Sequence, residues 1–352
     1  MTAQFNFQSN LMLTVLSIFI LSCNNEETPP SGEYATGVVV VNEGNFSDSD
    51  GSFDFYKPSE ATVSSGIYGQ VNGVQTSGLF QSIYFHEQSG YLVDQKGSKI
   101  TRVDAETFEY ITDITDELST PRYMVVANGK GYVSNWGAFD ANFNLPNSFV
   151  AVIDLSDNST IKTIAIGDGA EGLTVYAGNV FVANSYSNTI QEINTETDEV
   201  AATIEIADAP LGFVEDSSGK HWILSSSFIT GVARLTQIDL ASGIISKSFE
   251  VAGSAKSLNI DGPGSNLYYL SAPFGAEARV YTLPITASAA PAEALLSESN
   301  LYGIGVDPDT GELYVANHNA FQGNGTIQRY NVNAELIDTF AAGRAPSSFA
   351  FR

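Results

Sequence analysis

An apolar triplet that ends on a polar residue is the most regular feature along the chain. It returns about every 40 to 50 residues, the spacing typical of β-propeller blades. The polar residues that end the seven triplets are Asn42, Asp94, Asn135, Asn184, Ser225, Ser271 and Asn317. We therefore expect each triplet to form a strand in one of seven similar sheets.

Turns and further apolar runs surround each triplet. A second apolar run and a tight turn precede it, as at residues 85–90, 126–131 and 307–312. A loop and a third apolar run follow it, and the third run ends on an acidic or polar turn before a fourth run begins. The order strand, turn, strand, loop, strand, turn, strand is that of one propeller blade.

The first and last copies complete each other. No innermost strand precedes Val38, and a spare apolar run follows the seventh copy at Ser347–Phe351. Joining the two fragments closes the ring and removes the open sheet edges that would otherwise aggregate. The sequence thus predicts an all-β, seven-bladed β-propeller over residues 37–352, with the C-terminal strand completing the first blade.

Composition agrees with strands and excludes one class of function. Gly, Ser, Thr, Tyr and Phe are plentiful, which favours strands and tight turns. Acidic residues number 40 against 15 basic ones, so the formal charge is -25 and no basic run stands out. Such a chain repels phosphate backbones, so we expect no nucleic-acid binding.

The N-terminal residues indicate export. An apolar stretch at Leu11–Leu21 is short for a membrane span and is followed by Cys23 and a polar segment. The residues around Ser22 resemble a bacterial lipobox, in which the cysteine is lipidated. We expect a signal peptide at 1–22, a lipid-anchored tether at 23–36, and attachment to the outer membrane, at the cell surface, through the Cys23 lipid alone.

The motifs of common catalytic and metal sites are missing from the sequence. His86, His221 and His318 fall in three different blades without metal-ligand spacing, and Cys23 is the single thiol. No G-x-S-x-G elbow or phosphate-cradling glycine loop is present. We therefore expect no metal, no cofactor and no enzymatic activity, although some propeller enzymes use a funnel histidine, a role that His318 could take.

Aromatic residues gather in one class of loop. In a propeller, the loops between second and third strands share one face around the central channel. Six of these seven loops carry an aromatic residue, from Phe46 in the first to Phe321 in the last. Apolar area in loops is costly to expose unless a ligand or partner covers it, so this face is the candidate binding surface.

Two resemblances add to this interpretation. Residues 181–212 resemble the YVTN-type repeat of seven-bladed propellers. The succession of NEGN at 42–45, TPRYM at 120–124 and the loop at Trp136 is similar to the BtuG-like surface lipoproteins. That resemblance implies a protein that captures cobalamin or a related corrinoid for a TonB-dependent outer-membrane transporter.

The candidate ligand-binding residues combine the resemblance with the loop aromatics. They are Glu43, Asn45, Phe46, Gln95, Arg122, Trp136, Phe139, Phe143, Tyr186, Phe228, Phe274, His318 and Phe321. Two other functions remain open at this point. One is a protein-interaction scaffold on the cell surface, and the other is a propeller lyase that uses His318.

Overall fold

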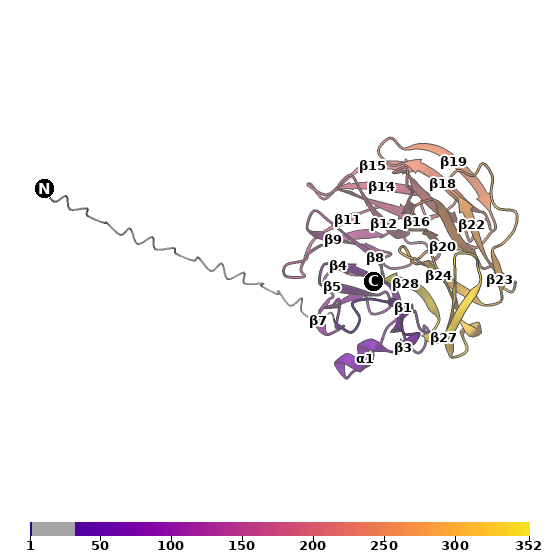
Figure 1. Ribbon diagram of the computed structural model, residues 1–352. Helices are drawn as coiled ribbons and strands as arrows, with labels where there is room; N and C mark the ends of the chain where they lie inside the picture. The colour runs from indigo at the N-terminus through magenta and orange to yellow at the C-terminus, as the bar shows by residue number, and fades with distance from the viewer. Residues whose placement is uncertain (2–31) are drawn as a thin grey trace. The chain divides into compact units, whose positions relative to one another are not determined.

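The computed structural model describes Met1 and residues 32–352 (Figure 1). The expected signal peptide, Cys23 and most of the expected tether lie outside the described residues. Residues 32–352 form one compact unit. Within it, no helix is both long and apolar enough to cross a membrane.

Seven four-stranded antiparallel sheets make up this unit, and each is one blade. The innermost strands are β28 (Pro346–Phe351), β4 (Phe80–His86), β8 (Pro121–Ala127), β12 (Ala170–Tyr176), β16 (Pro210–Glu215), β20 (Ala255–Ile260) and β24 (Leu301–Val306). The second strands are β1 (Val38–Asn42), β5 (Ser89–Asp94), β9 (Lys130–Asn135), β13 (Asn179–Asn184), β17 (His221–Ser226), β21 (Asn266–Ser271) and β25 (Leu313–Asn317). All seven predicted triplets lie in these second strands.

The outer half of each blade follows in chain order. The third strands are β2 (Ser52–Lys57), β6 (Lys99–Asp104), β10 (Phe149–Asp154), β14 (Thr189–Asn194), β18 (Ala233–Asp239), β22 (Ala278–Pro284) and β26 (Asn324–Tyr330). The outermost strands are β3 (Thr62–Ser64), β7 (Tyr110–Ile114), β11 (Thr160–Ala165), β15 (Glu199–Glu205), β19 (Ile244–Val251), β23 (Leu296–Glu298) and β27 (Leu336–Arg344). A short helix, α1 (Ile67–Asn72), links the first two blades, and a 3-10 turn, η1 (Asn319–Phe321), precedes β26.

The first blade closes the ring as predicted. Strand β28 pairs antiparallel with β1, with Phe349 opposite Val40, so the sheet order is β28-β1-β2-β3. The indigo and yellow segments accordingly lie side by side in Figure 1. Across the seam to the seventh blade, Tyr56 stacks on Phe340 at 4.1 Å between ring centroids. The all-β, seven-bladed prediction is confirmed.

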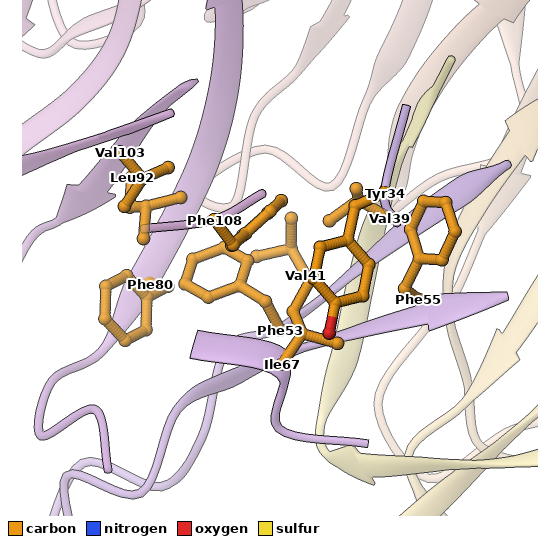
Figure 2. Packing of buried hydrophobic residues seen from close by; sticks show 10 residues of the cluster. All are labelled: Tyr34, Val39, Val41, Phe53, Phe55, Ile67, Phe80, Leu92, Val103 and Phe108. Carbon is orange, nitrogen blue, oxygen red and sulfur yellow. The ribbon is translucent and has the colours of Figure 1, made fainter. Parts of the chain in front are cut away.

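Apolar side chains fill the spaces between neighbouring blades. Figure 2 shows one such cluster, where Phe53 of the first blade lies beside Phe108 of the second. Tyr34 belongs to this cluster, is 3% exposed, and packs edge-on against Phe55 and Phe108 at 5.2 and 5.6 Å. Its backbone N–H also donates to the carbonyl of Glu106. The last residues of the expected tether are therefore part of the propeller core.

In four blades, the polar residue that ends the triplet hydrogen-bonds to the segment just before the innermost strand; these residues are Asp94, Asn135, Ser271 and Asn317. The side-chain oxygen of Asn135 accepts a hydrogen bond from the backbone N–H of Ser119, just before β8. In the seventh blade, the Asn317 amide donates to the carbonyl of Ser299, just before β24. A buried polar group needs such a partner, and these bonds help to fix where the innermost strands of the four blades begin. They thereby set the wall of the central channel.

Candidate functional site

A central cavity of about 750 Å³ is lined by the innermost strands of all seven blades. Three second-to-third-strand loops add Glu43, Gln95 and Trp136 to its lining. The cavity therefore reaches the face that carries those loops, and we call this end its mouth. Its volume is in the range of ordinary small-molecule sites.

One residue in each blade forms a ring just inside this mouth. In every innermost strand, the second residue lines the cavity. The seven ring residues are Gln81, Arg122, Glu171, Leu211, Lys256, Tyr302 and Ser347. Further along the same strands the wall becomes mainly apolar, with Phe213, Leu258 and Phe349 among its residues.

A β-bulge accompanies each ring position. In six blades the register with the second strand shifts directly after the first residue of the innermost strand, and in the sixth blade it shifts after Lys256. A bulge leaves one residue outside the ladder and turns its side chain in a new direction. The repeated bulge thus delivers one side chain per blade to the cavity.

Arg122 is the centre of the polar contacts on one side of the ring. Its guanidinium lies 3.3 Å from the Glu171 carboxylate, and both side chains are buried. It also donates to the side-chain oxygen of Gln95 and lies 3.9 Å from the centroid of the Trp136 ring. Most of its donors and its stacking face are thus already used within the protein.

Glu43 extends this network to the other side of the ring. Its carboxylate accepts hydrogen bonds from Gln95 at 3.3 Å and from the Tyr302 hydroxyl at 2.6 Å. The Lys256 ammonium lies 3.8 Å from the centroid of the Tyr302 ring. A single chain of contacts therefore runs from Glu171 in the fourth blade, through the third, second, first and seventh blades, to Lys256 in the sixth.

Burial shifts the pKa values of the groups in this network. Loss of solvation raises the pKa of the Glu171 carboxyl, and the nearby Arg122 charge opposes that shift. The Trp136 indole also acts to lower this pKa, although its N–H makes no hydrogen bond of normal geometry. Burial lowers the pKa of Lys256 to about 8, against the opposing charge of Glu43.

His318 and Phe321 pack beside Tyr302. The two rings stack at 3.9 Å between centroids, and both meet the Tyr302 ring edge-on. The Nδ1 atom of His318 accepts a hydrogen bond from the Phe321 backbone N–H at 3.0 Å. Burial lowers the pKa of His318, with Lys256 acting in the same direction. These contacts make His318 part of an aromatic wall.

The aromatic residues of the loops are exposed on this face. The exposed fractions are 70% for Phe46, 48% for Phe139, 78% for Phe143, 48% for Tyr186, 102% for Phe228, 107% for Phe274 and 43% for Phe321. All belong to loops between second and third strands, so six of these seven loops present an aromatic side chain to solvent. We call this set the aromatic rim.

The structure divides the candidate residues into three groups. Four of them line the cavity wall, namely Glu43, Gln95, Arg122 and Trp136. Three more pack against residues of that wall, namely His318, Phe321 and Phe139. The ring centroids of Phe139 and Trp136 are 5.8 Å apart. Five others lie on the rim and do not line the cavity, namely Phe46, Phe143, Tyr186, Phe228 and Phe274. Asn45 is used within its own loop, where its backbone N–H donates to Asp50 at 2.7 Å.

Sequence analysis missed Glu171, Lys256 and Tyr302, which belong to the ring. A signal for them exists in the repeat. In each copy a buried residue opens the innermost strand, the ring residue follows, and a hydrophobic residue comes two positions later, as in the segments beginning at Pro121, Ala255 and Leu301. Aligning the seven copies at this position would have placed all ring residues together.

His221 and the acidic pair Asp48 and Asp50 contact residues outside the cavity. His221 is fully buried against Tyr176, with 5.3 Å between ring centroids. Asp48 and Asp50 pair with Arg344 across the seam between the last and first blades. Within residues 32–352, no group of three or more His, Cys, Asp or Glu side chains is arranged to hold a metal ion.

Solved structures with the same architecture are numerous and distant in sequence. A quinonprotein alcohol dehydrogenase-like protein from Bacteroides thetaiotaomicron is 16% identical, with a TM-score of 0.68 over 90% of this chain and 78% of that chain. The periplasmic gluconolactonase of Pseudomonas aeruginosa is 11% identical, with a TM-score of 0.66 over 90% and 98% of the two chains. Hydrazine synthase of Kuenenia stuttgartiensis is 18% identical, with a TM-score of 0.57 over 74% and 85%. At such identities the likeness concerns the fold alone.

Comparison with families gives a more direct assignment. No protein of curated function matches this chain. A family model described as a domain of unknown function, DUF5074, matches residues 36–345. These residues contain every strand from β1 to β27, and with them most of the ring and the whole aromatic rim. The chain therefore belongs to the DUF5074 family.

Proposed function

We propose that this protein captures a bulky, largely neutral ligand, cobalamin or a related corrinoid, at the cavity mouth. The observation that carries the proposal is the position of the aromatic rim on the same face as the mouth of the cavity. Large exposed apolar area on a monomer marks a binding surface. A corrin ring offers a broad apolar face that could cover Phe139 and Phe321.

Neutral polar residues of the cavity wall next to the ring suit the amide arms of such a ligand. Cobalamin carries many neutral donors and acceptors around its macrocycle. The Tyr123 hydroxyl accepts a hydrogen bond from Gln81 at 2.8 Å and keeps its own proton to donate. Ser348 and Ser257 add hydroxyl groups to the cavity lining. Neutral partners of this kind give orientation without requiring a charged ligand.

The same proposal includes a place and a partner. Lipidation of Cys23 would hold the propeller at the cell surface, and a TonB-dependent outer-membrane transporter would receive the ligand. Both parts rest on the lipobox-like residues and on the resemblance of the NEGN and TPRYM elements to BtuG-like lipoproteins.

We propose that binding proceeds without catalysis. A general base must reach the proton that it removes, with a free nitrogen at hydrogen-bond distance. The Nδ1 atom of His318 is engaged by the Phe321 backbone, and its ring is stacked on the Phe321 side chain. Because Nδ1 accepts this bond, the neutral ring carries its proton on Nε2 and has no free lone pair there, which supports a packing role for His318 rather than the lyase role.

Titration of the full chain with cyanocobalamin, followed by calorimetry, tests the proposal. We expect saturable binding, and a loss of at least about tenfold in affinity for the Phe139→Ala/Phe321→Ala variant, because buried aromatic contacts supply much of such affinity. Tyr110→Ala/Ile161→Ala is the matched control, since these side chains are 49% and 50% exposed on outermost strands. No binding at micromolar protein would overturn the corrinoid proposal.

A protein-interaction scaffold is the second candidate. It is favoured by Phe228 and Phe274, which are fully exposed on the loops of two successive blades. A partner protein would cover both rings at once. If this candidate is correct, Phe228→Ser/Phe274→Ser abolishes binding of the partner, and the wild-type protein does not retain cyanocobalamin.

A further inference from the structure

We propose that Lys256 is an oxyanion-binding residue of the cavity, and that the captured ligand carries a carboxylate or phosphate which this ammonium receives. The inference rests on the proposed ligand capture, because it assigns one group of that ligand. It does not depend on the ligand being a corrinoid. Nothing in the comparisons assigns a role to this position.

The geometry places a cation without an ion-pair partner inside the cavity. Lys256 is the ring residue of the sixth blade and is half-buried. Its ammonium lies over the Tyr302 ring at 3.8 Å. Among residues 32–352 it has no hydrogen-bond acceptor and no ion-pair partner within 4.0 Å. An ammonium has three N–H donors. A ring face attracts the charge, but it does not offer these donors the acceptor oxygens that a carboxylate offers.

The acidic groups near Lys256 already have other partners. Glu43 accepts hydrogen bonds from Gln95 and Tyr302 on its two oxygens. Glu171 is paired with Arg122, which removes the only other cation of the ring. Lys256 is therefore the one ring cation whose charge remains available to a ligand.

The electrostatics favour an anion at this point. Burial lowers the pKa of Lys256 to about 8, while Glu43 acts to raise it. His318 lies close enough for the two groups to influence each other, and its pKa is lowered. An oxyanion on Lys256 would replace the lost solvation with charge-assisted hydrogen bonds and restore the charged form.

The rest of the cavity indicates what the anionic group is attached to. Beyond the ring the wall is formed by side chains such as Phe213, Leu258 and Phe349. A ligand with an oxyanion at one end and an apolar body would match this order. The phosphodiester of a corrinoid nucleotide loop and the carboxylate of a small organic acid share this chemistry.

Lysine acetylation of the full chain tests the inference without the natural ligand. The protein is treated with acetic anhydride in sodium phosphate, sodium citrate or sodium chloride of equal ionic strength, and each lysine is quantified by mass spectrometry. We expect phosphate or citrate to slow acetylation of Lys256 at least about fivefold relative to chloride. Lys162, on the outermost strand β11, is the internal control. Equal rates at Lys256 in all three salts would overturn the inference.

Thermal unfolding provides a second readout that needs no reactive lysine. Phosphate or citrate should raise the melting temperature of the wild type relative to chloride, and Lys256→Met should lose this increment while Lys256→Arg keeps part of it. An increment of the same size in Lys256→Met would contradict the inference. Protection by phosphate alone or by citrate alone identifies which oxyanion the cavity prefers.

Corrinoid binding separates this inference from the proposed function. Cyanocobalamin carries the phosphodiester and cobinamide lacks it. If Lys256 receives the phosphate, Lys256→Met weakens the binding of cyanocobalamin about tenfold, through the loss of charge-assisted hydrogen bonds, and leaves the binding of cobinamide unchanged. Equal binding of cyanocobalamin by wild type and variant leaves capture intact and removes Lys256 from it. If an oxyanion protects Lys256 but no corrinoid binds, the inference about Lys256 stands and the corrinoid proposal fails.

Discussion

Two buried charges of opposite sign lie side by side at the cavity mouth, and their contribution can be measured. Arg122 and Glu171 are 3.3 Å apart and nearly inaccessible to water. Removing one partner of such a pair leaves the other buried and uncompensated. We expect Arg122→Met to lower the free energy of unfolding by about 3 kcal/mol, measured by urea denaturation at pH 7.

The double variant and an exposed pair are the controls for this prediction. Arg122→Met/Glu171→Leu should recover most of the loss, because neither charge then remains buried. The pair Arg279 and Glu277 is about half exposed, at 53% and 50%, and spans 3.8 Å. Arg279→Met should therefore change stability by less than about 0.5 kcal/mol. A cost below about 1 kcal/mol for Arg122→Met would mean that Gln95 and water compensate for Glu171.

His221 predicts a pH dependence of stability. Both ring nitrogens are buried without a hydrogen-bond partner among the described residues, and burial lowers the pKa, although Glu215 and Asp216 act to raise it. The unfolded state therefore binds a proton near pH 6.5 that the folded state does not bind. The stability that the neutral ring supplies is complete above this pH and is lost as the pH falls.

Urea denaturation between pH 7.5 and pH 5 measures this effect. We expect the wild type to lose stability as the solution becomes acidic, by up to about 1.4 kcal/mol for each pH unit from this group. His221→Phe removes the titrating ring and keeps its volume, so its stability should fall less over the same range. Parallel curves for the two proteins would show that His221 keeps an ordinary pKa.

At the scale of the element, β28 is the strand that closes the ring. It pairs with β1 along five positions, and its removal would expose the edge of β1 in the first blade. We expect a chain that ends at Ala345 to lose cooperative thermal unfolding and to form oligomers on size exclusion. A synthetic peptide of residues 346–352, added during refolding, should restore the monomer in part.

A truncated chain that stays monomeric with the wild-type melting temperature would contradict this role of β28. The seam between the first and seventh blades would then depend on side-chain contacts and on the backbone hydrogen bonds that Glu43 and Gly44 donate to Ala345 and Arg344. The side-chain contacts across the seam include the stacked pair of Tyr56 and Phe340 and the hydrogen bond that the Arg329 guanidinium donates to the Tyr56 hydroxyl at 3.2 Å. The Tyr56→Ala variant in the full chain would measure how much these contacts contribute to the stability of the propeller.

The second strands could be predicted from the sequence, and the innermost strands could be predicted only in outline. A triplet such as Val39–Val41 is buried throughout, so its composition alone identifies it. In the innermost strands a bulge interrupts the alternation, and a shift of one residue reverses which side chains face the cavity. Lys256 could therefore be placed only by aligning the seven copies, whereas the exposed rim residues such as Phe228 could be inferred from their loops.

The contacts of the site depend on partners that are distant in the sequence. Tyr302 meets Glu43 from the other end of the chain, and Arg122 meets Glu171 from the next blade. No local pattern encodes such pairs, because closure of the ring decides which loops and strands become neighbours. The resemblance supplied Glu43 and Arg122 as candidates, and the fold supplied their partners.

At the scale of the whole molecule, the acidic excess opposes compactness. With 40 acidic and 15 basic residues, most carboxylates cannot have a basic partner. Several of the existing ion pairs are exposed and contribute little, such as that of Lys162 and Glu199 at 3.8 Å. Repulsion among the remaining carboxylates therefore outweighs attraction between paired charges, and added salt should weaken the repulsion more than the attraction.

Thermal unfolding at 20 mM and 300 mM sodium chloride tests this balance. We expect the higher salt to stabilise the folded state by about 1 kcal/mol, which corresponds to a melting temperature higher by about 2 °C for a chain of this size. The Lys256→Met variant separates screening from chloride bound in the cavity, because its increment should equal that of the wild type if net charge is the cause. A lower melting temperature in high salt would instead mean that the network of Arg122, Glu171 and Glu43 contributes more to stability than the charge excess removes.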